Sequence, residues 1–397
     1  MDTSHIASDN QLFPSSTPPT VPVTRLSYYG TAGQVFRLHL MNLLMNIITL
    51  GIYSFWGKTR IRRYMTSHVA VLNDRFEYTG TGKELLYGAL KAMLIFLPLI
   101  IVMSIPVVNI FGFIAFFAIL SVALYLALRY RLSRTKWRGI RFHLAGSVKE
   151  YFFLSLKRTI INIFTLGIKI PKSDIMRWSY IANHMSYGDL KFSYEGDSHK
   201  LKRIHLITLS ILIVGFGAGF IPLVIAGYNA ERAKYNVAPI EQTANSSIPA
   251  DQEVSQIPNQ NEQTVSNRQG NEKADKKMVG GIIGMYLGIG IGLLSRLWYQ
   301  AALWHEKFRG LRLANLRFKT DVTGKGLLKL YFTNLLIIIF TLGLGKPIAV
   351  HRTLRYYVTN MSIGGELKEL IAHQESLQQT SGMGDALAAD VGFDIGM

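Results

Sequence analysis

The sequence contains no cysteine, which excludes disulfide bonds, thiolate metal sites and cysteine nucleophiles. It is also poor in charge: Asp, Glu, Lys and Arg make up 17% of its 397 residues, whereas about a quarter is usual for a soluble domain. Hydrophobic residues make up 49%, and the mean hydropathy is +0.20. This composition predicts a chain whose apolar runs lie in lipid.

The charge that is present is strongly basic, with a net charge of +18 and a pI near 9.9. Such a balance can indicate a nucleic-acid binder. Here the basic residues lie in loops beside long apolar runs, which is the usual positive-inside pattern of membrane proteins. We therefore expect membrane lipids with anionic headgroups as partners, and no nucleic acid.

Four apolar stretches approach or exceed the ~20 residues that a helix needs to cross ~30 Å of hydrocarbon. They cover residues 86–104, 106–128, 204–228 and 279–301. None of the four contains Asp or Glu, although ion- and proton-coupled transporters usually carry a carboxylate within the membrane. This absence argues against coupled transport.

A seven-residue signature with the core Thr-Leu-Gly occurs three times, at residues 46–52, 162–168 and 338–344. Repeats of this kind indicate a protein built from repeated units. The apolar stretches that contain the signature are also long enough to span a membrane. Length alone therefore leaves two topologies open, with seven crossings or with four.

Charge distinguishes the two topologies. Six or seven Lys and Arg lie in each of the loops 57–86, 128–150, 169–203 and 302–326. If all seven stretches crossed, two of these loops would face outward, whereas with four crossings all four loops lie inside. We therefore expect re-entrant or interfacial helices at the signature, and both termini in the cytoplasm.

Short segments of alternating polarity accompany the signature. Residues 75–80 (RFEYTG) recur as 191–196 (KFSYEG), with weaker copies at 25–30, 141–146 and 317–320. Each predicts a short half-buried strand, and we expect these strands to pair at the cytoplasmic surface. The expected fold class is nevertheless all-α: an integral membrane protein of multi-pass helices with repeated Thr-Leu-Gly units and only short cytoplasmic strands.

Composition divides the chain into five parts. Residues 1–24 are polar and proline-rich, lack the apolar core of a signal peptide, and are expected to form a disordered tail. Residues 25–228 and 279–370 form a first and a second membrane repeat region. A polar linker at 229–278 separates them, and an acidic tail follows at 371–397.

The polar residues around the signature are the candidate polar membrane site. The set comprises Asn46, Thr49, Asn162, Thr165, Asn334 and Thr341. Polar residues at membrane depth are functional candidates by default, so they could form one site where the helix breaks converge. In the alternative interpretation, Asn and Thr only satisfy backbone groups where a helix ends.

Two further sets have an expected role. Gly280, Gly284, Gly288 and Gly292 lie four residues apart in the last predicted span, a spacing that lets helix backbones approach closely. We expect them to pack against another helix, most simply the predicted span at 204–228. Arg60, Arg62 and Arg63 are expected to contact anionic lipid, which attracts each such cation by about 1 kcal/mol, or else only to set the topology.

Residues 46–56 (NIITLGIYSFW), followed by Arg63-Tyr64 and by 73–78 (NDRFEY), resemble the YjgN-type bacterial inner-membrane proteins, which are grouped as a domain of unknown function. The resemblance extends from about residue 25 to residue 370. Family members often have proline before the tryptophan, where this chain has Phe55. The resemblance implies a multi-pass inner-membrane location and brings no reaction, ligand or catalytic residue.

No metalloprotease motif, nucleophile elbow or EF-hand loop occurs in the chain. We therefore expect no enzymatic activity, cofactor or metal. The expected function is that of a membrane scaffold, a lipid-interacting protein or a passive permease. A transporter or channel for a small solute is the alternative, and the sequence leaves the oligomeric state open.

Overall fold

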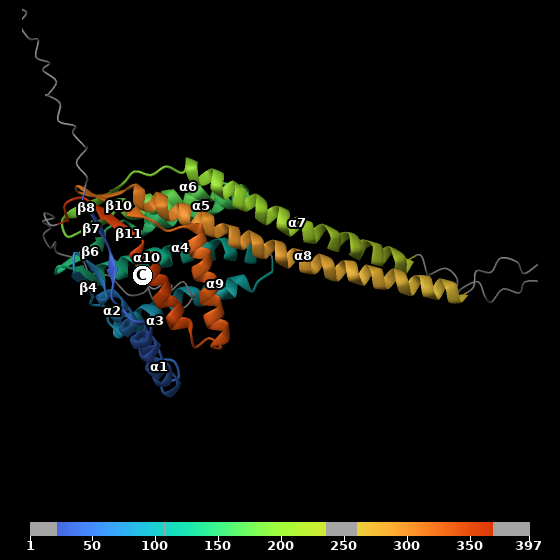
Figure 1. The fold of residues 1–397 in the computed structure, drawn as a ribbon, viewed down its shortest axis with the longest axis horizontal. Helices are drawn as coiled ribbons and strands as arrows, with labels where there is room; N and C mark the ends of the chain where they lie inside the picture. The colour runs from blue at the N-terminus through green and yellow to red at the C-terminus, as the bar shows by residue number, and fades with distance from the viewer. Residues whose placement is uncertain (1–21, 107, 236–259, 368–397) are drawn as a thin grey trace, which may run out of the picture.

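A computed structural model describes residues 22–106, 108–235 and 260–367. Most of the expected N-terminal tail, residues 236–259 of the expected linker, and the acidic tail lie outside these residues. Within them, five helix pairs alternate with short strands along the chain (Figure 1). A helix pair followed by a strand pair is therefore the repeating unit.

The elements are as follows. The helix pairs are α1 (Ala32–Ile48) and α2 (Ser54–Ser67), α3 (Gly82–Met103) and α4 (Asn109–Arg134), α5 (Val148–Phe164) and α6 (Ile170–Asn183), α7 (His199–Tyr235) and α8 (Gln260–Arg309), and α9 (Gly324–Phe340) and α10 (Lys346–Thr359). The strands that follow them are β3 (Val69–Val71) and β4 (Asp74–Tyr78), β5 (Thr135–Trp137) and β6 (Ile140–Leu144), β7 (Met185–Tyr187) and β8 (Leu190–Tyr194), β9 (Leu311–Leu313) and β10 (Leu316–Thr320), and β11 (Met361–Gly364). Two strands precede the first helix, β1 (Val23–Arg25) and β2 (Ser27–Tyr28).

The prediction of an all-α fold is wrong, because the strands form one antiparallel sheet in the order β1-β11-β10-β9-β8-β7-β6-β5-β4-β3-β2. β1 and β2 lie at opposite ends of this order, yet only Leu26 separates them in the sequence. Arg25 in β1 lies opposite Ser362 in β11, and Ser27 in β2 lies opposite Ala70 in β3. The sheet therefore closes almost completely into a barrel, and the N-terminal strands complete the fifth unit.

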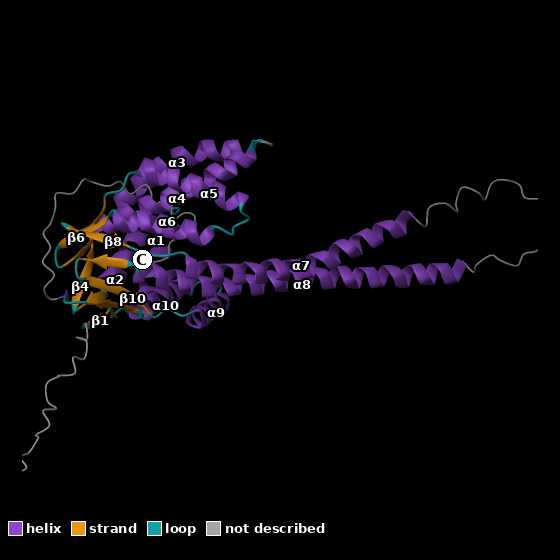
Figure 2. Ribbon diagram, turned by 90° about the horizontal axis from the view of Figure 1, so that it is seen from above, coloured by secondary structure: helices purple, strands orange, loops and turns teal. Residues whose placement is uncertain are grey.

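Two-residue turns connect β3 to β4, β5 to β6, β7 to β8 and β9 to β10, and the first residue of each turn has a left-handed backbone. The φ angles are +52° and +67° at Leu72-Asn73, and +49° and +79° at Arg138-Gly139. Such turns match the twist of two paired strands, which explains why the strands fold back at once. Every strand pair thus has its open end on the rim from which the helices leave. Figure 2 shows the strands gathered at one end of the molecule.

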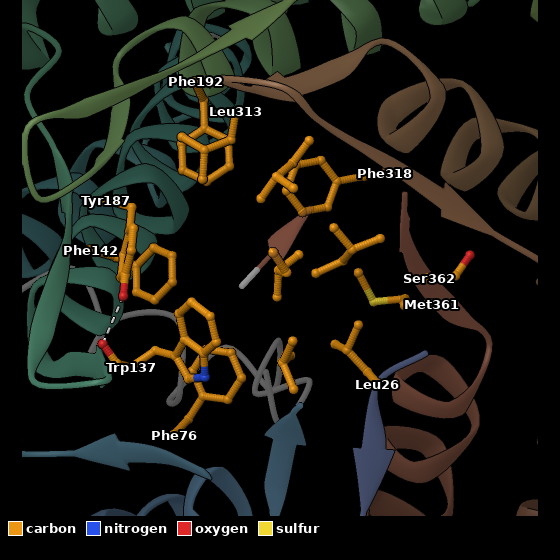
Figure 3. A pocket seen from close by; sticks show the side chains of 14 residues that line it. Leu26, Phe76, Trp137, Phe142, Tyr187, Phe192, Leu313, Phe318, Met361 and Ser362 are labelled. Carbon is orange, nitrogen blue, oxygen red and sulfur yellow. Dashed lines mark hydrogen bonds between the residues drawn. The ribbon is translucent and has the colours of Figure 1, made fainter. Parts of the chain in front are cut away.

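Aromatic and aliphatic side chains line the interior of the barrel (Figure 3). The ring centroids of Phe142 and Tyr187 lie 4.9 Å apart, and those of Phe192 and Phe318 lie 6.0 Å apart. The Tyr187 hydroxyl donates a hydrogen bond to the Trp137 carbonyl at 2.9 Å, and burial raises the pKa of Tyr187 to about 12. An apolar cavity of about 130 Å³ remains among these side chains, without the polar partners that would hold water.

Four described helices are long and apolar enough to cross a membrane, and they overlap the four predicted spans. They are Gly82–Met103, Asn109–Arg134, His199–Asn229 and Asp275–Arg309. The signature helices α1, α5 and α9 have 17 residues each and are not among them. Figure 1 shows α1 and α9 steeply inclined to the long α7/α8 pair, which projects from the body and continues into the expected linker.

Candidate functional site

The three Thr-Leu-Gly signatures form the same turn, at the tips of the helix pairs α1/α2, α5/α6 and α9/α10. In each turn the Leu has a φ of 48–50° and the Gly a φ of 82–90°. The left-handed region costs residues other than Gly about 1–2 kcal/mol, so the Gly relieves one of the two strained positions. The threonine hydroxyls donate to carbonyls four residues earlier, those of Met45 (2.8 Å), Ile161 (2.8 Å) and Ile337 (2.6 Å).

Two of the three asparagines of the candidate polar site each join the two helices of one hairpin. Asn334 Nδ2 donates to the Ala349 carbonyl at 3.2 Å, and Asn162 Oδ1 accepts from the Ser173 hydroxyl at 2.8 Å. Asn46 Oδ1 is buried and has no hydrogen-bond partner among the described residues. In the sheet order, the α3/α4 and α7/α8 units lie between α5/α6 and the other two hairpins. The structure therefore does not gather the six residues in one place.

Asn42 has the same role in the first hairpin as Asn334 has in the last, and sequence analysis missed it. Its side chain is buried, and its Nδ2 donates to the Gly57 carbonyl at 3.1 Å across the hairpin. The signal was present, because Asn42 precedes Thr49 by the same interval as Asn334 precedes Thr341. Comparing the copies beyond the signature would have identified it.

The tips of the three hairpins expose large apolar side chains. Leu50 and Leu342 are each 93% exposed, and Leu166 is 84% exposed. Aliphatic or aromatic residues that flank each tip are exposed as well. Since each Å² of apolar surface left in water costs roughly 25 cal/mol, tips of this kind are suited to a lipid environment.

A basic hollow of about 460 Å³ lies between α2 and the start of α3. Its lining comprises Tyr53, Trp56, Thr59, Arg60, Arg63, Thr81, Gly82 and Lys83. Trp56 lies so close to Gly82 that a Cβ at Gly82 would be 2.6 Å from the indole Cγ. The hollow therefore requires glycine at the first position of α3, and two of the three predicted lipid-contact arginines line it.

The third of these arginines, Arg62, lies elsewhere. Its side chain is 8% exposed and lines a separate cavity of about 190 Å³, together with Arg131 and Tyr78. That cavity is bordered by α2, α4 and strands of the barrel. Arg62 is thus placed toward the interior of the protein, whereas Arg60 and Arg63 are exposed.

A buried polar cluster joins the third unit to the fourth, and sequence analysis missed this too. His205 on α7 is fully buried, with Nε2 2.9 Å from the Gly167 carbonyl and Nδ1 2.8 Å from Arg296 Nη1. These partners require a neutral imidazole whose Nε2 donates and whose Nδ1 accepts. One turn further along α8, Tyr299 donates to Asp174 Oδ2 at 2.7 Å. The sequence signal was Arg296, a charge inside a predicted span.

The described residues contain no group of three or more His, Asp or Glu side chains that could hold a metal ion. Residues 23–390 match a family described as "Bacterial protein of unknown function (DUF898)".

The chain belongs to this family. It is also similar to the inner membrane protein YjgN of Escherichia coli K12 and of Salmonella typhimurium LT2, with 26% identity over 152 and 150 residues. These matches cover 37% and 36% of this chain, and 37% of each relative, so little more than a third of the relatives' length is matched. No solved structure matches the chain.

Family membership confirms the resemblance that residues 46–56 and 73–78 indicated. The expectation of an inner-membrane protein is confirmed to the extent that these relatives are inner membrane proteins and the chain has four helices able to cross a membrane. Neither description assigns an activity, a ligand or a catalytic residue.

Proposed function

We propose that the protein is a non-enzymatic, lipid-interacting scaffold of the bacterial inner membrane. In this arrangement α3/α4 and α7/α8 cross the membrane, and the three Thr-Leu-Gly hairpins enter the cytoplasmic leaflet. The barrel and both termini lie in the cytoplasm. Charge supports this orientation, because the four basic loops contain the barrel strands and such loops remain on the cytoplasmic side.

The observation that carries the proposal is the exposure of three equivalent apolar tips on helix pairs that leave the same rim of the barrel. Basic residues follow each tip, among them Lys58, Lys169 and Lys346. An apolar tip with cations behind it is the pattern of an interfacial anchor, in which apolar groups enter the acyl region and cations remain with anionic headgroups. Three such anchors around one barrel would hold the lipids of one leaflet at fixed positions.

The depth of the tips tests the proposal. Because the chain has no cysteine, single cysteines at Leu50, Leu166 and Leu342 can each carry a nitroxide label without background. In the full-length protein in lipid nanodiscs, oxygen should relax these labels strongly, because oxygen concentrates in hydrocarbon, and a water-soluble nickel chelate should not.

A label at Asn73, in a β-turn at the opposite end of the barrel, is the matched control, and the nickel chelate should relax it. If the three tip labels and the Asn73 label are equally accessible to nickel, the tips lie in water and the proposal fails.

A transporter or channel for a small solute is the second candidate, and one observation favours it. Arg296 lies within a helix able to cross the membrane, and ionisable groups at such depth are functional candidates by default. The lipid-interacting proposal takes priority because Arg296 and His205 bind each other, whereas the apolar tips contact nothing that would cover them among the described residues.

A further inference from the structure

We infer that the basic hollow between α2 and α3 is a phosphate-binding site that holds the headgroup of an anionic phospholipid. This inference rests on the proposed function and specifies which lipid chemistry the scaffold recognises. The cavity of about 460 Å³ has the size of ordinary small-ligand sites.

The charges that line the hollow favour an anion. It is lined by three cations and no acid. Arg63 donates from Nη2 to the Gly80 carbonyl at 3.2 Å, whereas Arg60 and Lys83 are exposed and make no hydrogen bond or ion pair within the described part of the chain. The adjacent Glu84 binds Arg134, with 2.7 Å between Oε1 and Nη2. Two cations thus remain for a phosphate, which guanidinium groups bind with two parallel hydrogen bonds.

The position of the hollow along α3 matches the level of lipid headgroups. α3 begins at Gly82, and its apolar run starts two residues after Lys83. Trp56 and Tyr53 also line the hollow, and these two residue types concentrate at membrane interfaces. A phospholipid whose phosphate lies beside Lys83 would have its acyl chains next to the apolar surface of α3.

The repeat shows that packing alone does not require the cations. At the corresponding place between α8 and α9, Trp298 lies against Gly324 as Trp56 lies against Gly82, and Lys325 follows as Lys83 does. There, however, Ala302 and His305 occupy the positions of Arg60 and Arg63. His305 Nε2 lies 2.8 Å from the Val322 carbonyl, which repeats the bond from Arg63 to Gly80. Arg63 therefore has a structural role that histidine also fills. Packing between the two helices does not require the charge of Arg60, because alanine occupies its position in the repeat.

The test is a lipid titration of the full-length protein. Delipidated protein in a neutral detergent is titrated with phosphatidylglycerol, and the bound lipids are counted by native mass spectrometry. Arg60→Gln combined with Lys83→Gln should remove one tightly bound lipid and weaken its binding about 25-fold, since each cation near the surface contributes about fivefold. Lys325→Gln, at the equivalent position without the two arginines, should change binding less than twofold.

Charge-preserving Arg60→Lys combined with Lys83→Arg should restore binding, which separates loss of charge from loss of fold. Arg60 also borders a second hollow of about 490 Å³ beside α1, which Arg37 lines. If Arg37→Gln abolishes binding and Lys83→Gln does not, the site assigned here is wrong.

Inorganic phosphate distinguishes a lipid from a soluble ligand. If phosphate binds the wild type as tightly as phosphatidylglycerol does and the double variant weakens both equally, the lipid assignment is overturned. If the double variant retains every bound lipid while the tip labels remain protected from nickel, this inference fails and the proposed function stands.

Discussion

Alanine substitutions at three glycines of α8 test how closely α7 and α8 pack. Gly280, Gly284 and Gly288 look equivalent in the sequence, but the structure gives each a different surrounding. A Cβ at Gly280 would meet no atom within 4 Å, and one at Gly284 would lie 3.5 Å from the Gly219 Cα. A Cβ at Gly288 would lie 1.9 Å from the Gly215 carbonyl oxygen. The same spacing motif thus contains one glycine with free space for a Cβ, one where a Cβ would be in ordinary contact, and one where a Cβ would overlap the facing backbone.

The expected free energies of unfolding follow from these distances. Replacing Gly by Ala inside a helix stabilises it by about 0.5–1 kcal/mol when nothing opposes the new methyl group. Gly280→Ala and Gly284→Ala should therefore be neutral or stabilising. Gly288→Ala has to move the two backbones apart by roughly 1.5 Å to reach ordinary contact. Overpacking of this kind costs about 1–3 kcal/mol, so the net effect, after the helical gain is subtracted, should be a loss of up to about 2.5 kcal/mol.

The assay is equilibrium unfolding of the full-length variants in one mixed-micelle system, with helix content followed by circular dichroism. The free energy of unfolding should be lower for Gly288→Ala than for the other two variants. Equal stability of Gly280→Ala and Gly288→Ala would refute the close packing of α7 on α8 through these glycines. Gly292 resembles Gly288 in this respect, because a Cβ at Gly292 would lie 2.5 Å from the Leu212 side chain and 2.7 Å from the Leu212 Cα.

Two further predictions concern buried polar groups. Arg296→Gln should lower the free energy of unfolding by about 1.5–3 kcal/mol, because the buried His205 loses a charged donor, whereas the exposed Lys202→Gln should stay within about 0.5 kcal/mol of wild type in the same assay. Tyr187→Phe should cost about 1 kcal/mol near neutral pH, because the Trp137 carbonyl loses its donor. Burial raises the pKa of Tyr187 from 10.0 to about 12, so this phenol's stabilising contribution is complete below pH 10 and is lost as the pH rises toward 12. Wild type should therefore lose more stability than Tyr187→Phe over that interval, and equal losses would contradict this.

The membrane helices could be predicted from sequence because a long uncharged apolar run fits one structure, a helix that crosses the hydrocarbon of a membrane. The first strand of each β-pair could not. β3 contains three residues and is separated from α2 by one residue, and β5 follows α4 directly. Three residues are too few to show alternation, and no turn separates them from the helix. Only the second strand of each pair, such as β4, is long enough to show its alternation.

Closure of the barrel could not be predicted from the sequence either, because it depends on pairing between strands near the two ends of the chain. Arg25 lies opposite Ser362, and the Leu26 backbone N–H donates to the Met361 carbonyl at 3.1 Å. The weak strand pattern at residues 25–30 gives no sign of its partners. The all-α expectation was therefore wrong because the short strands that the sequence does indicate give no sign that they join into one sheet.

The residues of the proposed lipid site could be predicted in part, and helical geometry explains which part. Residues three apart share a helix face, whereas residues two apart do not. Once residues 54–67 are helical, Arg60 and Arg63 must lie together and Arg62 must lie away from Arg60, as the two cavities show. A count of basic residues in a loop could not make this distinction. Lys83 reaches the same hollow only after the chain has passed through β3 and β4. The proposed phosphate site therefore combines Arg60 on α2 with a cation at the start of α3, and a count of basic residues within one loop does not reveal that combination.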